Sequence, residues 1–291
     1  MSFLEAVLLG VIQGLSEFLP VSSTAHLTIV GKALGLVAGE HPEAWTAFIA
    51  VTQLGTLAAM VTYFASDLRA MAVALVRDLL TGCGGKGIRG ISRDSLLVVY
   101  MILGTIPVAV VGYGLEHLIE GTLTKSLLFI GYSMLLLALF LWLAETSAAH
   151  VRTLNSVTWK DALVIGLAQV VALLPGASRS GTTITAGLFL GLRRSAAARF
   201  SFLLSLPAVF ASGILELVKA VPLIAAGGGV THFAAANLIV ATLVSGITGY
   251  AAIAWLLNYL IRYTTMPFVW YRIAIGSAIL FLIAAGLLSP K

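Results

Sequence analysis

Long runs of apolar residues constrain this chain more than any other feature. Six of them are long enough to cross the hydrocarbon core of a bilayer, which takes about 20 residues in an α-helix. They lie near residues 45–65, 96–116, 126–145, 198–221, 234–259 and 269–288. Of the 291 residues, 59% are hydrophobic and only 10% are charged, so a water-soluble fold could not cover its apolar surface. The sequence therefore predicts an all-α polytopic membrane protein.

Two further apolar stretches, about 3–36 and 160–192, are interrupted by polar and turn-forming residues. The interruptions run from Ser16 to His26 and from Pro175 to Thr183. Irregular backbone at membrane depth is tolerated only where protein or trapped water satisfies its amide groups. We therefore expect both stretches to form re-entrant helix-loop-helix hairpins, which enter the membrane and return to the same face.

The order of these elements predicts an internal repeat. A hairpin followed by three spans occurs twice, over about 1–145 and about 158–291 of a single integral membrane domain that covers 1–291. Pro20 precedes a Ser/Thr-rich run as Pro175 does. Because each unit has an odd number of crossings, the second unit must insert upside down, as in the inverted repeats of transporters.

Basic residues predict the orientation in the membrane. One side receives most of them, and the positive-inside rule assigns that side to the cytoplasm and both termini to the outside. The residues counted on the cytoplasmic side are Arg69, Arg77, Lys86, Arg89, Arg93, Arg152, Lys160, Arg193, Arg194, Arg199, Arg262 and Arg272. The residues on the other side are Lys32, Lys125, Lys219 and Lys291. The formal net charge of +5 therefore reflects topology, and no nucleic-acid partner is expected.

Two other phosphatase signatures are incomplete in this sequence. Cys83 is the only cysteine, and its spacing to Arg89 is that of thiol phosphatases, but the expected His and strand-loop-helix context are missing. Ser178-Arg179 is similar to the signature of vanadium-type lipid phosphatases, which have a His where this chain has Thr185. Both classes are therefore disfavoured.

The first interruption gathers polar groups at the junction of two helices. Gln13 and Glu17 are four residues apart and share a helix face, and Pro20 ends that helix. The hydroxyl groups that follow belong to Ser22, Ser23 and Thr24. They lie where unpaired amide groups gather at a helix start, with His26 one turn further on. Such a helix start favours binding of an anion.

The second interruption repeats this plan with a permanent cation. Pro175-Gly176 breaks the helix, and Arg179 offers a planar pair of donors to phosphate oxygens. Further hydroxyl donors belong to Ser178, Ser180 and Thr183. The sequence therefore predicts a phosphate-binding site here.

Glu17 and Arg179 are the strongest functional candidates. An ionisable side chain inside an apolar segment costs on the order of 3 kcal/mol on insertion scales, so function is the first expectation for both. A purely structural ion pair between them is the alternative. Single hydroxyl groups, His26 and Gln13 have ordinary structural explanations when each is taken alone.

The chain resembles the undecaprenyl-diphosphate phosphatase family, also called the bacitracin-resistance family, in two long motifs. They are Gln13-x3-Glu17-Phe18-Leu19-Pro20-Val21-Ser22-Ser23-Thr24-x-His26 and Pro175-Gly176-Ala177-Ser178-Arg179-Ser180-Gly181-Thr182-Thr183, with Thr52-Gln53-Leu54-Gly55 as a third similar patch. The resemblance implies a bacterial cytoplasmic-membrane enzyme that converts undecaprenyl diphosphate to undecaprenyl phosphate. It also implies recycling of the lipid carrier for peptidoglycan synthesis, bacitracin resistance, and a site open to the outer face.

By motif position, the resemblance implies a role for each residue. Glu17 corresponds to an essential acidic residue near a divalent cation, Mg²⁺ or Ca²⁺, Ser23 to the proposed nucleophile, and His26 to the proposed acid/base. Ser178, Arg179 and Thr183 match the family's diphosphate-binding positions, and we count Arg179 with Glu17, Ser23 and His26 as catalytic. The further substrate-binding candidates are Gln13, Ser22, Thr24, Gln53 and Ser180. Many members have Glu where this chain has Gln13, and a neutral amide binds metal less strongly, so ligation by two carboxylates is not expected.

The expected reaction is attack of Ser23 on the terminal phosphorus, with His26 or Glu17 accepting its proton and water releasing phosphate from phosphoserine. Direct attack by metal-bound water is the alternative mechanism. A transporter or flippase for an anionic lipid is the rival function, because it would use Arg179 without a nucleophile. The expected partners are an isoprenoid diphosphate lipid and membrane lipid, with a second copy of the chain in a homodimer as a further candidate.

Overall fold

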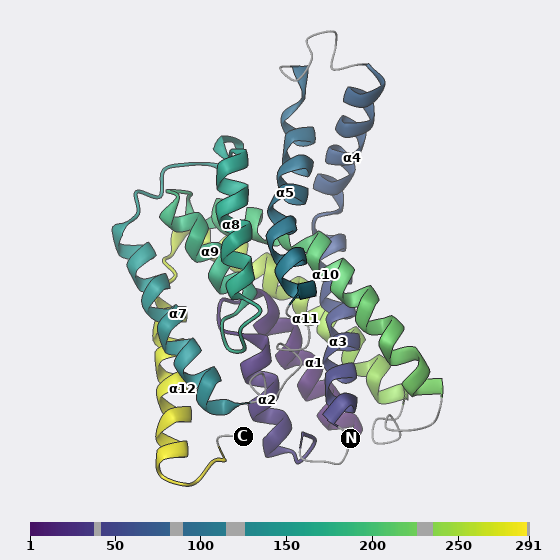
Figure 1. Cartoon of the computed structure of the whole chain (residues 1–291), viewed down its shortest axis with the longest axis vertical. Helices are drawn as coiled ribbons and strands as arrows, with labels where there is room; N and C mark the ends of the chain where they lie inside the picture. Colours follow the sequence, from purple (N-terminus) through teal and green to yellow (C-terminus); the bar gives the residue numbers. More distant parts are fainter. Residues whose placement is uncertain (38–41, 82–89, 115–125, 226–234, 290–291) are drawn as a thin grey trace.

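A computed structural model describes residues 1–37, 42–81, 90–114, 126–225 and 235–289 (Figure 1). Within these ranges the structure is helical, without a named β-strand. The helices are α1 (Phe3–Phe18), α2 (Ser23–Ala33), α3 (Pro42–Tyr63), α4 (Ala65–Leu80), α5 (Arg93–Gly114), α7 (Leu127–Ser147), α8 (Trp159–Val171), α9 (Arg179–Phe189), α10 (Arg194–Ala225), α11 (Ala235–Arg262) and α12 (Met266–Ala284), with a short 3₁₀ turn, η4, at Leu154–Ser156.

Each of the six predicted spans corresponds to a helix, in the order α3, α5, α7, α10, α11 and α12. The last five are long and apolar enough to cross a membrane individually. Helix α3 meets that criterion only together with α4, to which it is bent by 68°. The prediction of an all-α, multi-pass membrane protein is confirmed by this composition and length.

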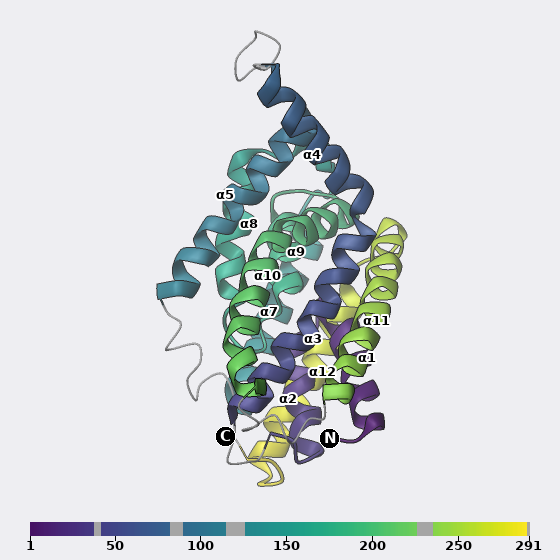
Figure 2. The same cartoon turned by 90° about the vertical axis from the view of Figure 1, so that its right-hand side faces the viewer.

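Helix α4 is missing from the sequence prediction, which placed a connection there. Its charged residues lower the mean hydropathy, so it does not resemble a span. The buried residues Met71, Ala74 and Asp78 recur every three or four positions and so share one face of the helix. Helix α4 packs against α5 (Figure 2). The Asp78 carboxylate accepts hydrogen bonds from Ser92 N at 2.7 Å and Ser95 Oγ at 2.8 Å, which joins the two helices.

Each interrupted apolar stretch forms a pair of short helices, α1–α2 and α8–α9, joined by a tight turn. Figure 1 shows the first pair toward the end that carries both termini and the second pair toward the opposite end. Phe3 and Ser22 in the first pair are separated by as many residues as Trp159 and Ser178 in the second. The two pairs therefore share one local plan.

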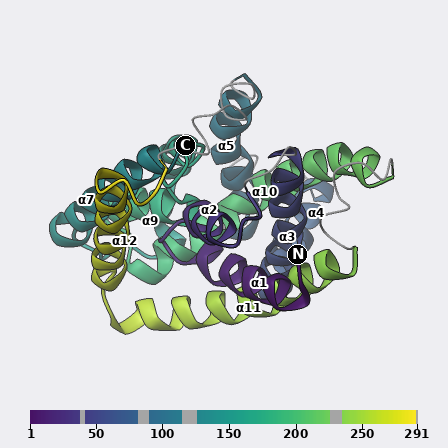
Figure 3. The same ribbon diagram turned by 90° about the horizontal axis from the view of Figure 1, so that it is seen from below.

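Each helix pair packs against the other half of the chain. Helix α1 makes its most extensive contact with α11, and α8 with α5 (Figures 1 and 3). Glycines permit these close approaches: a Cβ on Gly14 would lie 1.9 Å from Thr248 Oγ1, and one on Gly166 would lie 2.1 Å from the carbonyl oxygen of Gly104. This crossed packing holds the two turns near the middle of the bundle.

Candidate active site

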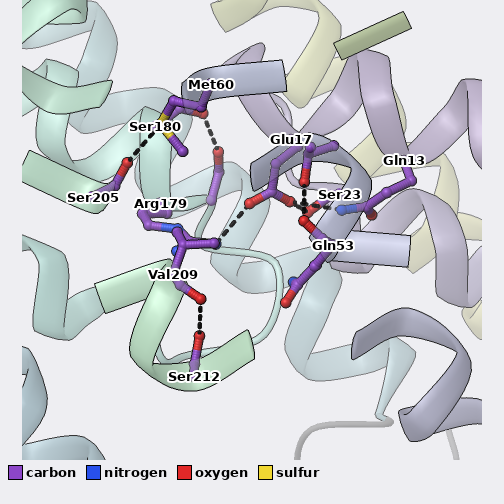
Figure 4. Close-up of polar contacts among 12 residues, drawn as sticks. Gln13, Glu17, Ser23, Gln53, Met60, Arg179, Ser180, Ser205, Val209 and Ser212 are labelled. Carbon is purple, nitrogen blue, oxygen red and sulfur yellow. Dashed lines mark hydrogen bonds and ion pairs between the residues drawn. The ribbon is translucent and has the colours of Figure 1, made fainter. Parts of the chain in front are cut away.

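The turns of the two helix pairs meet through an ion pair. Arg179 Nη2, at the start of α9, lies 2.6 Å from Glu17 Oε1, near the end of α1 (Figure 4). The Glu17 side chain is 8% exposed and that of Arg179 is 23% exposed. Ser180 Oγ adds a second link by donating to the carbonyl oxygen of Leu19 at 3.0 Å. The two strongest candidates from the sequence are thus in direct contact.

The second oxygen of Glu17 binds residues of its own hairpin. Ser23 Oγ donates to Glu17 Oε2 at 2.7 Å, and Gln13 Nε2 donates to the same oxygen at 3.1 Å. Figure 4 shows Gln13, Ser23 and Arg179 arranged around this carboxylate. One carboxylate therefore connects a hydroxyl group, an amide and a guanidinium from both halves of the chain.

Ser22 and Ser178 take the same strained conformation at the two helix starts. Their φ angles are 79° and 71°, in a region of backbone conformation that residues other than glycine seldom occupy. The Oγ of Ser22 accepts from Ala25 N at 3.4 Å, and the Oγ of Ser178 accepts from Gly181 N at 3.1 Å. Strain of this kind persists where the surroundings fix it, and it is concentrated at functional sites.

No hydrogen bond joins His26 to the Ser23 hydroxyl. Its Nδ1 lies 2.7 Å from the carbonyl oxygen of Ser22, so this nitrogen carries the hydrogen, and its Nε2 lies 2.7 Å from Tyr271 Oη. The His26 and Tyr271 rings also stack, with centroids 5.6 Å apart. The structure therefore pairs Ser23 with Glu17 and pairs His26 with a tyrosine that the sequence analysis did not identify.

Three other predicted site residues lie outside the Glu17 cluster. Thr24 is exposed. Gln53 accepts from Thr56 through its main-chain oxygen, and no hydrogen bond joins its amide group to Glu17 or Ser23. Thr183 Oγ1 donates to the carbonyl oxygen of Arg179 at 2.7 Å, which supports α9 from within. These positions give no direct support to substrate contact by the three side chains.

Arg272 was counted with the basic residues that set the orientation, and for this residue the assignment is wrong. It is 1% exposed, and it donates to three carbonyl oxygens: Pro20 at 3.2 Å, Gly176 at 3.0 Å and Met134 at 3.3 Å. Arg272 thus links both turns from α12. Its place inside the predicted span 269–288 is the signal that could have identified it. Lys86, Arg89, Lys125, Lys291 and Cys83 lie outside the described residues.

The oxygen atoms around Glu17 fit a divalent cation only in part. Among the described residues, no cluster of three or more His, Cys, Asp or Glu side chains could hold a metal ion. Oε1 of Gln13 is buried and has no hydrogen-bond partner in the described part of the chain. Mg²⁺ and Ca²⁺ bind carboxylate and amide oxygens. Glu17 and Gln13 could therefore supply two ligands, with the remainder coming from water and substrate.

Comparison with known proteins agrees with the two motifs. A sequence model of the family described as "Bacitracin resistance protein BacA" matches residues 6–278. An undecaprenyl-diphosphatase of Syntrophobacter fumaroxidans is 48% identical over 283 residues, which cover 97% of this chain and 98% of that protein. An undecaprenyl-diphosphatase of Pelodictyon phaeoclathratiforme is 45% identical over 297 residues, covering 100% of each chain. The protein therefore belongs to the bacitracin resistance protein BacA family.

Proposed function

We propose that the protein is an undecaprenyl-diphosphatase, which hydrolyses undecaprenyl diphosphate to undecaprenyl phosphate and phosphate. Relatives of nearly the same length carry this name. The observation that carries the proposal is the Glu17 carboxylate, which accepts from the Ser23 hydroxyl on one oxygen and from Arg179 on the other. This product is the lipid carrier used in peptidoglycan synthesis, so the activity accounts for cell-wall recycling and bacitracin resistance.

The helix pairs act as re-entrant hairpins of an inverted repeat in this proposal. Helices α1, α2, α8 and α9 have 16, 11, 13 and 11 residues, and a transmembrane helix needs about 20. Equal spacing, the matched conformations of Ser22 and Ser178, and the crossed packing on α11 and α5 all support the repeat. Opposed hairpins place the site near the membrane midplane.

The end of the bundle opposite the termini faces the cytoplasm. Several basic connections gather there: the main chain of Arg152 bonds to Gly191 and Arg193, and Arg194 pairs with Glu145 at 2.5 Å. The positive-inside rule places such an end in the cytoplasm. Both termini then lie outside the bacterial cytoplasmic membrane, the side from which spent carrier lipid reaches the site.

The first chemical step transfers the terminal phosphoryl group to Ser23. Arg179 and the amide groups at the start of α9 hold the diphosphate, because both present positive charge to its oxygens. Ser23 Oγ forms a bond to the terminal phosphorus while the bond to the bridging oxygen breaks. Glu17 accepts the hydroxyl proton, since its Oε2 already lies 2.7 Å from Ser23 Oγ, and undecaprenyl phosphate leaves.

The second step releases phosphate and restores Ser23. Water attacks the phosphorus as the bond to Ser23 Oγ breaks, and Glu17 exchanges protons with the water and the serine. A divalent cation held by Glu17 and Gln13 would supply charge neutralisation for the phosphate oxygens. His26, fixed by Ser22 and Tyr271, orients the α2 helix start rather than activating Ser23 directly. In this proposal the Ser178 hydroxyl can donate a hydrogen bond to the substrate, whereas the Ser180 hydroxyl already donates to the carbonyl oxygen of Leu19.

The test is phosphate release from undecaprenyl diphosphate by the purified protein in detergent, with and without Mg²⁺ or Ca²⁺. We expect metal-dependent release that is lost in Ser23→Ala and in Arg179→Ala. Ser212→Ala is the matched control, because Ser212 is exposed on α10 and bonds only to its own helix, at Val209 O, within the described residues. Folded wild-type protein that releases no phosphate would contradict the proposal and favour a lipid transporter or flippase. Oligomeric state, measured in the same detergent, tests the predicted homodimer.

A further inference from the structure

A small cavity lies beside the Glu17–Arg179 pair, on the side of α10. Its polar lining consists of Glu17, Arg179, Ser180, Ser201 and Ser205, and apolar side chains from α1, α3 and α10 complete it. The space open to the centre of a water-sized sphere is about 10 Å³. On this measure one water molecule needs roughly 10–15 Å³, so the cavity fits a single water and excludes a phosphate group.

The hydroxyl groups of this cavity have bonding capacity left for a ligand. Ser205 Oγ donates to the carbonyl oxygen of Phe202 at 2.9 Å, and Ser201 Oγ shares a hydrogen bond with Thr183. Each serine oxygen has two acceptor positions, and Oε1 of Glu17, which accepts from Arg179, has a second position left for a water proton. A water molecule between them would find the two to four polar partners that a buried water usually has.

We propose that this cavity, which we name the α10 water site, holds the water that hydrolyses the phosphoserine formed at Ser23. This inference rests on the proposed function. Glu17 is the link, because the same carboxylate lines the cavity and accepts from the Ser23 hydroxyl. The bond from the water oxygen to phosphorus forms as the bond from Ser23 Oγ to phosphorus breaks. One water proton passes to Glu17, and Ser23 Oγ regains a proton.

The arrangement of α10 suits the selection of one water molecule. Ser201, Ser205 and Val209 are four residues apart, so they line one face of the helix, with the hydroxyl groups followed by an apolar side chain. Phe18 packs edge-on against Phe202 at 5.5 Å on the same side of the site. Apolar walls keep bulk water away, and the two serines hold the attacking molecule in place.

Two variants of one serine test the water site. Ser205→Val fills the cavity with methyl groups and removes the hydroxyl, whereas Ser205→Ala removes the hydroxyl and leaves the space open to water. Ser212→Val, two turns further along the same helix and exposed, is the matched control. Rapid quenching measures undecaprenyl phosphate, free phosphate and phosphoserine separately. In Ser205→Val we expect one equivalent of undecaprenyl phosphate in a burst, phosphate release slowed about tenfold or more, and accumulated phosphoserine.

The remaining outcomes decide the inference. Ser205→Ala should lose less activity than Ser205→Val, and Ser212→Val should match the wild type. Release of phosphate by Ser205→Val at the rate of Ser212→Val would overturn the water site, as would equal slowing of both steps without phosphoserine. If Ser205→Val does not fold, Ser201→Ala removes a partner of the water without adding volume and must show the same accumulation. Wild-type protein without activity would instead overturn the proposed function.

Discussion

The two helix pairs, α1–α2 and α8–α9, share the conformation of one helix start but carry different chemical groups there. Ser22 and Ser178 have nearly equal positive φ angles, and each side chain accepts from the amide three residues later. The next residue is Ser23 in α2 and Arg179 in α9, and both side chains bind Glu17. Two helix starts with the same conformation thus carry a hydroxyl group on one side and a cation on the other. Two matched helix starts with one carboxylate between them are enough to build an asymmetric site.

A second equivalent pair differs in its hydrogen bonds. Gln13 precedes Ser22 by as many residues as Gln169 precedes Ser178, and both side chains are buried. Gln13 Nε2 donates to Glu17, whereas both amide atoms of Gln169 are without a partner in the described part of the chain. Of these two glutamines, Gln13 therefore contacts the Glu17 carboxylate, whereas Gln169 has no such contact in the described part of the chain.

Among these variants, removal of the Glu17 carboxylate, which both helix pairs share, should have the largest effect on phosphate release. Glu17→Ala takes away the acceptor of Ser23 and the counter-charge of Arg179, so phosphate release should fall by about 10³-fold or more. Steady-state release from undecaprenyl diphosphate measures it. Glu5→Ala is the control, because Glu5 is half-buried at the other end of the same helix, where its carboxylate accepts from Ser2 N at the α1 cap. Activity of Glu17→Ala within tenfold of Glu5→Ala would mean that the two hairpins work without a common base.

Loss of the arginine that joins the two turns should have the next largest effect. Arg272→Met removes the donors to Pro20 and Gly176, and a displacement of about 1 Å between nucleophile and phosphate site can cost on the order of 10²-fold in kcat. We expect this loss in kcat with KM changed about threefold or less, since Arg179, the proposed phosphate-binding residue, is retained.

The matched variants for this experiment are Arg272→Lys and Arg262→Met. Lysine keeps the charge but lacks the planar group that reaches three carbonyl oxygens, so it should restore activity only partly. Arg262 is exposed in the last turn of α11, and its replacement should leave kcat unchanged. Full activity of Arg272→Lys would show that charge alone, rather than the linked geometry, is required.

The sequence predicted the elements and the central contact because both depend on local signals. Apolar length identified the spans, Pro20 and Pro175 identified the breaks, and the cost of burying charge brought Glu17 and Arg179 together as candidates. Helix α4 was missed because its charged residues hide an amphipathic pattern with only a narrow buried face.

Local sequence signals do not reveal contacts between residues that are far apart in the chain. Tyr271 and His26 are 245 residues apart, and no local pattern marks a tyrosine as the partner of a histidine. Arg272 resembled the other basic residues near the ends of spans, and only its burial, which depends on the packing of α12 and α7, distinguishes it. The serines of α10 could not be identified from the sequence either, because small hydroxyl residues in membrane helices commonly bond to their own backbone.

Loss of the hydrogen bond between Tyr271 and His26 should lower kcat less than loss of Arg272 does. Tyr271→Phe keeps the stacked ring and removes one hydrogen bond to Nε2, which is worth about 1 kcal/mol, or about fivefold in kcat. Tyr250→Phe, on α11 and 44% exposed, is the control. In a His26→Ala background the Tyr271 substitution should have no further effect. An additive loss in the double variant would separate Tyr271 from His26.

The smallest change in activity is expected when Gln169, in the second helix pair, is replaced. Gln169→Leu replaces two buried polar atoms, for which the described residues provide no partner, by an apolar side chain of similar size. It should leave kcat unchanged and raise the free energy of unfolding by about 1 kcal/mol, seen as a higher melting temperature in detergent. The equivalent change Gln13→Leu should lower phosphate release and its metal dependence, because Gln13 contacts Glu17. If both substitutions impaired catalysis equally, the second repeat would also supply a polar group to the reaction, and the division of roles between the two hairpins would be wrong.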